Sequence, residues 1–214
     1  MTEKTAAAPE RRPQRWGADA PADDAQARER ILDGAERCYR RLGIGRTRMG
    51  DIAAEVGVHR TTLYTYFATK DAVLAAAFLR EADGILTKVE PMLTGEGSFE
   101  DRLVSASVVS LRETRASQYM SLLIDPTSAG HTLHAATASE AWFERVARTL
   151  EPALTEAVAA GDVRDDVPIA AIVRWVWRMS FSLASEPPDG ADGGDEGVLR
   201  AFLVPALRPG AGRL

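Results

Sequence analysis

Two short helical patterns separated by a single glycine lie between residues 47 and 70, and they constrain the fold more than any other part of the sequence. The first is an apolar stripe that ends at Gly57 and consists of Met49, Ile52, Ala53 and Val56. The second follows at once with inward-facing Val58, Leu63 and Phe67. Ala53 is small enough for two helices to approach closely, and Gly57 can adopt the positive φ that the turn requires. Residues 48–67 therefore predict a helix-turn-helix.

The outward face of the second short helix carries hydrogen-bonding side chains and no acid, which suits contact with DNA. Such a helix fits the major groove, where Arg60 can pair with a guanine. Lys70 begins the next helix, where backbone N–H groups favour an anion. Solvent-facing charge without a partner is the alternative for Arg48, Arg60 and Lys70. The candidate DNA-binding residues are Thr47, Arg48, His59, Arg60, Thr61, Thr62, Tyr64, Thr65, Tyr66 and Lys70.

This pattern resembles the DNA-binding signature of the TetR family of transcriptional regulators. The residues that carry the resemblance are Asp51-Ile52-Ala53, Gly57-Val58, Thr62-Leu63-Tyr64, Tyr66-Phe67 and Lys70. It implies an N-terminal domain of three helices that binds DNA and a larger helical domain that binds a ligand and dimerises. His59 departs from the signature, since the family often has Ser or Thr as the cap of the recognition helix. A neutral imidazole can accept the capping hydrogen bond, so we weigh a pH-sensitive cap against a solvated histidine without a role.

Helical spacing of apolar residues continues along the chain, and we expect an all-α fold with about nine helices. Asp23 or Asp24 offers the N-cap of a first helix of about five turns. Its apolar face consists of Ala27, Ile31, Ala35, Cys38 and Leu42. Thr47 and Thr69 are the expected caps of the second and fourth helices. No strand alternation longer than a few residues occurs, and later helices are expected near residues 99–115, 139–160, 168–185 and 198–207.

Composition and spacing divide the chain into three parts. Residues 1–24 have no apolar period and are expected to form a disordered tail. The helix-turn-helix domain occupies residues 25–85, and residues 86–214 form the ligand-binding and dimerisation domain. The whole chain carries a net charge of −5, whereas residues 25–85 hold ten basic and eight acidic side chains. This local positive charge favours one region that meets phosphate, with a coding bias toward arginine as the alternative explanation.

The C-terminal region contains a helix from Pro168 that is apolar all round, so both its own domain and a partner must cover it. By the resemblance, the last two helices pair with those of a second subunit in a four-helix bundle. A symmetric dimer also matches two DNA half-sites about one helical turn apart. The expected interface residues are Ile172, Val176, Phe181, Leu199, Phe202 and Leu203.

A ligand pocket is expected among the middle helices, where aromatic residues and methionine recur at helical spacing. Their apolar character indicates a small hydrophobic ligand, and an ordinary core is the alternative reading of the same pattern. The candidate lining residues are Tyr119, Met120, Leu123, His131, His134, Trp142, Phe143, Val146, Trp175 and Met179.

Together these features predict a TetR-type repressor that binds a palindromic operator as a homodimer and is released by a small-molecule effector. A regulator that activates, or that responds to no ligand, is the first alternative. A helical metal-binding enzyme that uses His131 and His134 is the alternative from another class. No glycine-rich phosphate loop or Gly-x-Ser-x-Gly motif accompanies this pair, so we expect no catalytic residue, metal or cofactor.

The expected location is the cytoplasm. Cys38 is the only cysteine, so no internal disulfide can form, which suits a reducing compartment. The N-terminus opens no apolar stretch of the kind that a secretory signal needs. The most apolar stretch, residues 169–184, is interrupted by Arg174 and Arg178 and is too short to span a bilayer, so no membrane partner is expected.

Overall fold

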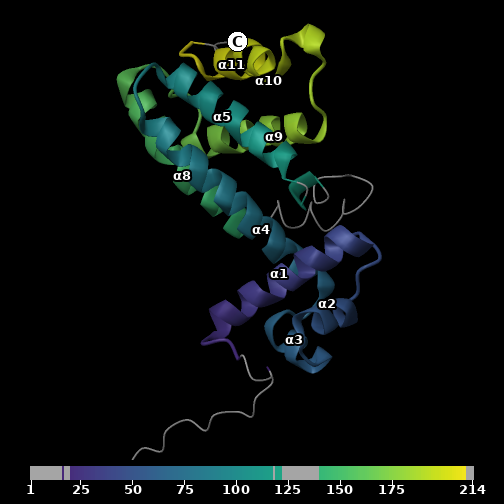
Figure 1. The fold of residues 1–214 in the computed structure, drawn as a ribbon. Helices are drawn as coiled ribbons and strands as arrows, with labels where there is room; N and C mark the ends of the chain where they lie inside the picture. Colours follow the sequence, from purple (N-terminus) through teal and green to yellow (C-terminus); the bar gives the residue numbers. More distant parts are fainter. Residues whose placement is uncertain (1–15, 17–19, 118, 122–139, 211–214) are drawn as a thin grey trace, which may run out of the picture.

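The protein is described by a computed structural model that places Trp16 and residues 20–117, 119–121 and 140–210. The regular elements of these residues are all helices, which confirms the expected all-α fold. They form two groups stacked end to end (Figure 1), with the first three helices at one end and the later helices at the other. The helix α4 (Lys70–Val89) runs from the first group into the second.

The remaining elements follow in chain order. The first group contains α1 (Asp24–Leu42), α2 (Met49–Val56) and α3 (Arg60–Tyr66). The second group opens with a 3-10 turn, η1 (Glu90–Thr94), and α5 (Phe99–Ala116). It continues with α8 (Glu140–Ala160) and α9 (Ile169–Ser185). It closes with η2 (Gly190–Asp192), α10 (Gly194–Val198), a π-helical turn η3 (Leu199–Leu203) and α11 (Val204–Leu207).

The helix N-termini follow the expected capping pattern with one exception. Asp23 accepts a hydrogen bond from the Gln26 N–H, and Thr69 accepts one from the Ala72 N–H, so both predicted caps are confirmed. The prediction that Thr47 caps α2 is wrong. The cap is Arg48, whose N–H donates to Asp51 Oδ2 at 2.8 Å, while the Thr47 hydroxyl donates to the Gly43 carbonyl at 2.8 Å.

The first group packs around a close approach of α1 and α2. Gly34 lies where the two helices meet, and a Cβ built on it would overlap the Cγ2 methyl of Val56. Ala53 of α2 is also buried, as its small size predicts. Gly57 ends α2 with φ of 75° in the left-handed region, which confirms the turn inferred from the sequence.

The second group is held together by an apolar core and by arginines that bridge its helices. Arg115 on α5 donates to both carboxylate oxygens of Asp195 and to the Leu183 carbonyl, which ties α5 to α9 and α10. Arg208 and Arg200 pair with acids at the start of α5. Within the described residues, no helix combines the length and apolar character needed to cross a membrane.

Candidate functional site

The helix α3 divides its side chains between the core and the solvent. Thr62 and Leu63 are buried, with exposed fractions of 2% and 0%. The opposite face exposes Arg60, Thr61, Tyr64 and Thr65. The helix α3 itself lies at the end of the molecule away from the second group of helices (Figure 1).

His59 begins this helix and acts as its cap. Its Nδ1 accepts a hydrogen bond from the Thr61 N–H at 3.4 Å and lies 2.8 Å from the Thr61 hydroxyl. A ring nitrogen that accepts must be unprotonated, so the cap requires the neutral imidazole at Nδ1. Of the two alternatives weighed from the sequence, the structure therefore contains the capping histidine.

Arg60 and Tyr64 form one unit on the exposed face. They are four residues apart, so they are neighbours on one side of the helix. The Arg60 Nη2 donates to the Tyr64 hydroxyl at 2.8 Å, and its guanidinium carbon lies 5.4 Å from the ring centroid. The phenol ring thereby restricts the arginine to a position above the exposed surface of α3.

Three other candidate DNA-binding residues make contacts within the domain. Thr47 is 1% exposed and Thr62 is 2% exposed, so both side chains are buried within the domain. The Lys70 ammonium donates to the backbone oxygens of Ile44 and Gly45 at 2.6 and 3.4 Å. It thus fixes the loop that leads into α2, while Arg48 lies exposed at the start of that helix.

Trp16 packs against the same end of the domain. Its ring meets Tyr66 edge-on with the centroids 6.0 Å apart, and Trp16 is only 8% exposed. Trp16 was expected to lie in a disordered tail, and this expectation is wrong for Trp16. A lone tryptophan among Pro and Arg has no helical period that would have indicated the contact. The rest of that tail through residue 15, with residues 17–19, lies outside the described residues.

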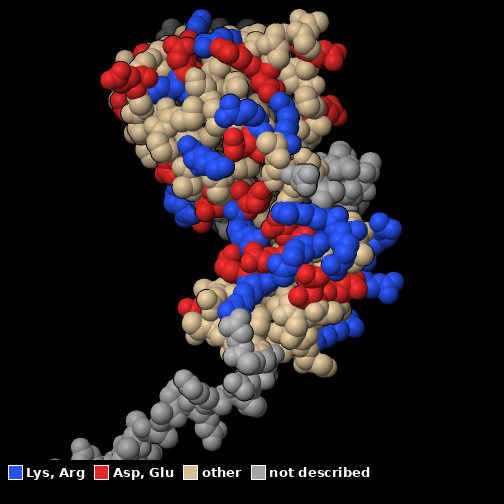
Figure 2. All heavy atoms as spheres, viewed as in Figure 1, with Lys and Arg blue, Asp and Glu red and all other residues tan. Residues whose placement is uncertain are grey.

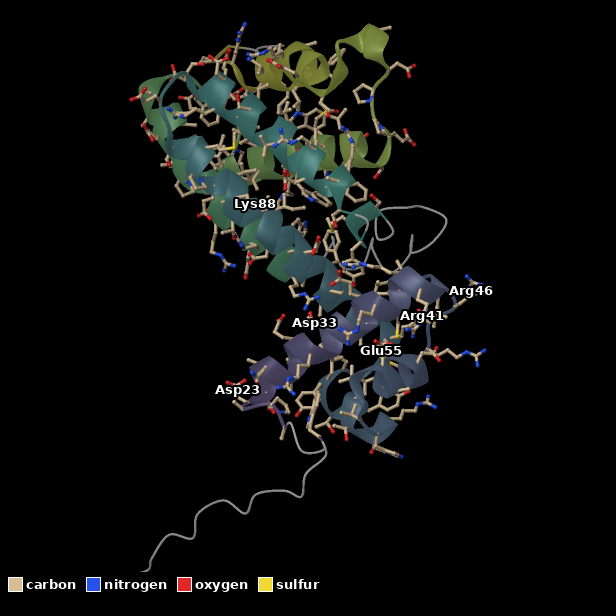
Figure 3. The ribbon with its side chains drawn as sticks, in the orientation of Figure 1. Asp23, Asp33, Arg41, Arg46, Glu55 and Lys88 are labelled. Carbon is tan, nitrogen blue, oxygen red and sulfur yellow. The ribbon has the colours of Figure 1, made fainter. Side chains whose placement is uncertain are left out.

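The charged side chains of the first group lie mostly on α1 and α2 (Figure 2), where basic and acidic residues are interleaved. Arg37 and Arg41 on α1 both reach Glu55 on α2, at 2.7 and 3.0 Å. Arg41 and Glu55 point toward one another across the two helices (Figure 3). Hydrogen bonds from Arg37 and Arg41 lower the pKa of the Glu55 carboxyl below its usual value. These ion pairs connect the helix-turn-helix to α1.

A cavity of about 120 Å³ lies within the second group of helices. The face of α4 that meets it consists of Phe78, Ala82, Ile85, Leu86 and Val89. The contribution of α5 is Leu103, Ala106, Ser107, Ser110, Leu111 and Thr114. The walls from α8 and α9 include Trp142, Val146, Thr149, Val176, Trp177 and Ser180. The lining is therefore apolar and aromatic, with a few hydroxyl groups.

Three of the pocket residues expected from the sequence line this cavity: Met120, Trp142 and Val146. Tyr119 is buried elsewhere, in a stack with Tyr39, and Phe143 lies beneath the Arg174 guanidinium at 4.5 Å. Trp175 is 45% exposed, and Met179 is partly buried without lining the cavity. The other candidates, Leu123, His131 and His134, lie outside the described residues.

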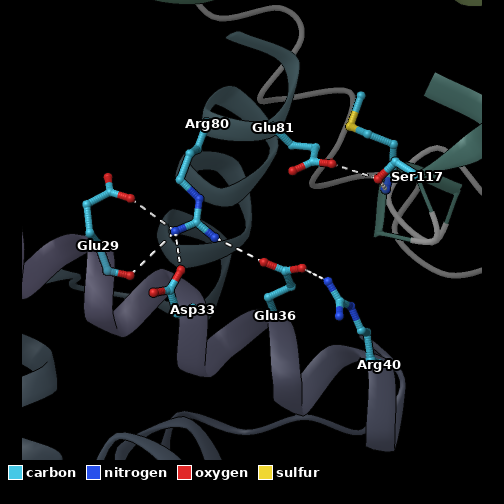
Figure 4. A network of polar contacts seen from close by, with 8 residues as sticks. Glu29, Asp33, Glu36, Arg40, Arg80, Glu81 and Ser117 are labelled. Atoms are coloured by element: carbon cyan, nitrogen blue, oxygen red, sulfur yellow. Dashed lines mark hydrogen bonds and ion pairs between the residues drawn. The ribbon is translucent and has the colours of Figure 1, made fainter. Parts of the chain in front are cut away.

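Arg80 connects α4 to the DNA-binding end of the molecule. It is 23% exposed, and its guanidinium reaches three acids on α1 at 2.7 to 3.2 Å (Figure 4): Glu29, Asp33 and Glu36. Arg80 lies two residues after Phe78 and two before Ala82, which both line the cavity. Arg80 therefore links the stretch of α4 that lines the cavity to α1.

A second contact joins the two groups beside this network. Tyr39 of α1 stacks on Tyr119 with centroids 6.1 Å apart and an interplanar angle of 12°. Burial raises the pKa of both phenols. Glu81 accepts a hydrogen bond from the Ser117 hydroxyl at 2.7 Å (Figure 4), which holds the end of α5 against α4.

The expected dimer-interface residues occupy several environments within one chain. Ile172, Val176, Leu199 and Leu203 are at most 4% exposed, so they have little surface left for a partner. Phe181 lines the cavity. Phe202 is 64% exposed, and Trp175, which was expected in the pocket, is 45% exposed. Among the described residues of the later helices, these two are the large apolar side chains exposed to solvent.

No group of three or more metal-binding side chains occurs among the described residues. The pair considered for a metal enzyme, His131 and His134, lies outside them. The described geometry is instead that of an exposed short helix joined by α4 to an apolar cavity.

Residues 31–77 match the family described as bacterial regulatory proteins, tetR family. An HTH-type transcriptional repressor of Mycobacterium tuberculosis is 30% identical over 148 residues, which cover 67% of this chain and 73% of the repressor. The chain belongs to the TetR family. An uncharacterised HTH-type regulator of the same organism is 28% identical over 184 residues, 86% of each protein. Its relatives make this TetR protein a transcriptional regulator and not an enzyme.

Solved structures of the same fold include two regulators with a described biology. The repressor AlkX of Dietzia, implicated in biodegradation of n-alkanes, has 20% identity and a TM-score of 0.59, covering 88% of this chain and 95% of AlkX. FadR of Bacillus subtilis, solved with stearoyl-CoA, has 14% identity and a TM-score of 0.60, covering 84% of this chain and 99% of FadR. At these identities the likeness to this TetR protein is one of fold.

Proposed function

We propose that this regulator is a repressor that binds a palindromic operator as a homodimer and releases it when a small apolar ligand fills the cavity. The observation that carries the proposal is the continuity of α4. One helix lines the cavity from Phe78 to Val89 and holds α1 through Arg80. Residues 25–85 would then form the DNA-binding domain, and residues 86–214 the ligand-binding and dimerisation domain, acting together in the cytoplasm.

Within the proposed DNA interface, the exposed side chains of α3 have different roles: some contact bases and others contact phosphates. Arg60, held over Tyr64, is the candidate for reading a guanine, because its guanidinium can donate two hydrogen bonds to O6 and N7. Thr61, Thr65 and Tyr64 are placed for phosphates or thymine methyls. Arg48 adds a phosphate contact from α2. Lys70 and His59 support this surface by fixing the preceding loop and capping α3.

The proposed release requires two arrangements of α4. A ligand that fits the cavity better in one arrangement shifts the population toward it. The ion pairs of Arg80 carry this shift to α1, and the distance between the two recognition helices of a dimer changes. Operator half-sites lie about 34–36 Å apart, so a small change in that distance weakens binding to both.

A first experiment tests binding to the DNA upstream of the regulator's own gene. Fluorescence anisotropy should show an affinity that falls steeply with salt, with a slope of about 0.9 per phosphate contacted. Arg60→Ala should relax the preference for the operator over unrelated DNA, whereas Arg48→Ala should weaken both and flatten the slope by about one. Salt-independent binding, or none to any duplex, would contradict the proposal.

The dimer is tested by Phe202→Arg. Phe202 is 64% exposed, so the arginine should leave the protomer folded while placing two like charges across a symmetric contact. We expect sedimentation to show a monomer, and operator affinity to fall. Thr155→Arg, on the exposed face of α8, is the matched control and should remain dimeric. A Phe202→Arg protein that sediments like the wild type would rule out this surface as the interface.

A further inference from the structure

The charge of the cavity lining limits which ligands can bind there. Of the described residues that surround it, none carries a charge. Its polar groups are the indole N–H groups of Trp142 and Trp177 and five hydroxyls, contributed by Ser107, Ser110, Thr114, Thr149 and Ser180. The nearby guanidinium of Arg145 is already engaged by Asp83 and Glu90. Any ionised group on a ligand would therefore lose its water without gaining a counter-ion, which is strongly unfavourable.

Most of these hydroxyls lack a partner within the described part of the chain. Thr149 accepts a hydrogen bond from Arg145. The hydroxyls of Ser107, Ser110, Thr114 and Ser180 make none with any described residue. A serine or threonine in a helix commonly donates to the carbonyl four residues earlier. Hydroxyls that instead face an apolar cavity are unsatisfied until water or a ligand pairs with them.

Three of the free hydroxyls form a ladder along one helix. Ser107, Ser110 and Thr114 are spaced three and four residues apart on α5, so they share a face. With a rise of 1.5 Å per residue, the first and last are separated by about 10 Å along the helix axis. Ser180 on α9 also lines the cavity. The side chains of α4 that line the cavity, among them Phe78 and Ile85, are all apolar.

We propose that the ligand of this cavity is an uncharged, mainly apolar molecule with two or more hydroxyl or carbonyl oxygens, which pair with the hydroxyls of Ser107, Ser110 and Thr114. The inference rests on the proposed function, because it takes the cavity as the effector site. The hydroxyls of Ser107 and Thr114 lie about 10 Å apart along α5, which sets the separation of the ligand's polar groups.

A matched series of three probes tests this ligand class on the full-length protein. Octane-1,8-diol, octan-1-ol and octanedioate share one chain length and differ in the number and charge of their polar ends. Trp142 and Trp177 line the cavity, so intrinsic tryptophan fluorescence reports binding. The diol should bind most tightly, octan-1-ol should bind about 3- to 10-fold more weakly for its lost hydrogen bond, and the dianion should not compete.

Substitutions on α5 then test whether the hydroxyls of Ser107 and Thr114 bind the diol. Ser107→Ala combined with Thr114→Val should weaken the diol about 10-fold and leave octan-1-ol within a few-fold, because each neutral hydrogen bond contributes little by itself. Ser105→Ala, an exposed position on the same helix, should change neither. The inference is overturned if the diol fails to bind at its solubility limit, if octanedioate binds as tightly as the diol, or if Ser105→Ala has the effect of the double variant.

Operator binding in the same samples separates this inference from the proposed function. Release of the upstream DNA by the diol supports both. A diol that binds, as judged by fluorescence, without changing operator affinity upholds the ligand class and contradicts ligand release. A protein that binds the diol but no DNA upholds the ligand class and contradicts the repressor.

Discussion

Replacing Thr61 by glutamate is expected to lower operator affinity by about 100-fold or more, because like charges across an interface cost several kcal/mol. Thr61 is exposed in the first turn of α3. A carboxylate at that place is favourable for the helix, since the N-terminal end of a helix dipole attracts negative charge. The same carboxylate would face the phosphates in the proposed complex. Folding and DNA binding should therefore respond in opposite directions.

Two control variants show whether the effect comes from a negative charge at position 61. One removes the hydroxyl without adding a charge, and the other adds a negative charge elsewhere in the protein. Thr61→Gln has nearly the size of the glutamate without its charge, and its operator affinity should stay within about 10-fold of wild type, as expected for one lost hydrogen bond. Thr155→Glu adds the same charge on α8 and should leave affinity unchanged. Anisotropy titrations and thermal melts of all three give both quantities. If Thr61→Glu binds the operator as tightly as Thr61→Gln, α3 is not the helix that enters the groove.

The helix-turn-helix was predictable from sequence because the interactions that define it are local. Gly57 is the residue that the turn geometry requires, and the apolar residues around it pack within about 20 positions of one another. Single side chains were harder to assign. Thr47 has the right chemistry for a cap, yet its hydroxyl bonds backward to Gly43 and Asp51 supports the N-terminus of α2 from the other side. Thr47 and Asp51 are both spaced to form a capping hydrogen bond at the N-terminus of α2, and the spacing alone does not predict which of them forms it.

The cavity was only partly predictable for a different reason. Periodicity shows which face of a helix avoids water, but not whether that face meets another helix or an empty space. Phe78, Ile85 and Val89 lie on one apolar face of α4, a pattern that is equally typical of a packed core, yet they line the cavity. The ladder from Ser107 to Thr114 carried the better signal, because three hydroxyls on the inner face of a helix are not expected in a closed core.

The same limit applies to the proposed dimer surface. An apolar helix such as α9 must be buried on several sides. The sequence does not show which of its residues are buried within the same chain and which remain exposed for a partner. Leu199 and Leu203 are completely buried by the chain itself, while Phe202 between them is exposed. The three residues lie in or beside a π-helical turn, whose irregular pitch changes the direction of side chains relative to an ideal helix. A regular helical projection could not separate them.

Replacing Gly34 by leucine is expected to destabilise the protein by about 2 kcal/mol, which corresponds to a melting temperature roughly 4–8 °C lower. Gly34 lies inside α1, where leucine alone would improve helix propensity by up to about 1 kcal/mol. However, its Cβ would overlap the Val56 methyl of α2, and Val56 is β-branched and stiff. The added carbons must push α2 away from α1, and α3 moves with it.

Gly84→Leu makes the identical change where nothing opposes it. Gly84 is exposed on α4, and no atom lies within 4 Å of the position that its Cβ would take. That variant should therefore gain up to about 1 kcal/mol from propensity and melt roughly 2–4 °C higher than wild type. Differential scanning calorimetry of the pair measures both signs. If both variants shift the melting temperature in the same direction, the contact between α1 and α2 is not the tight approach that positions the recognition helix.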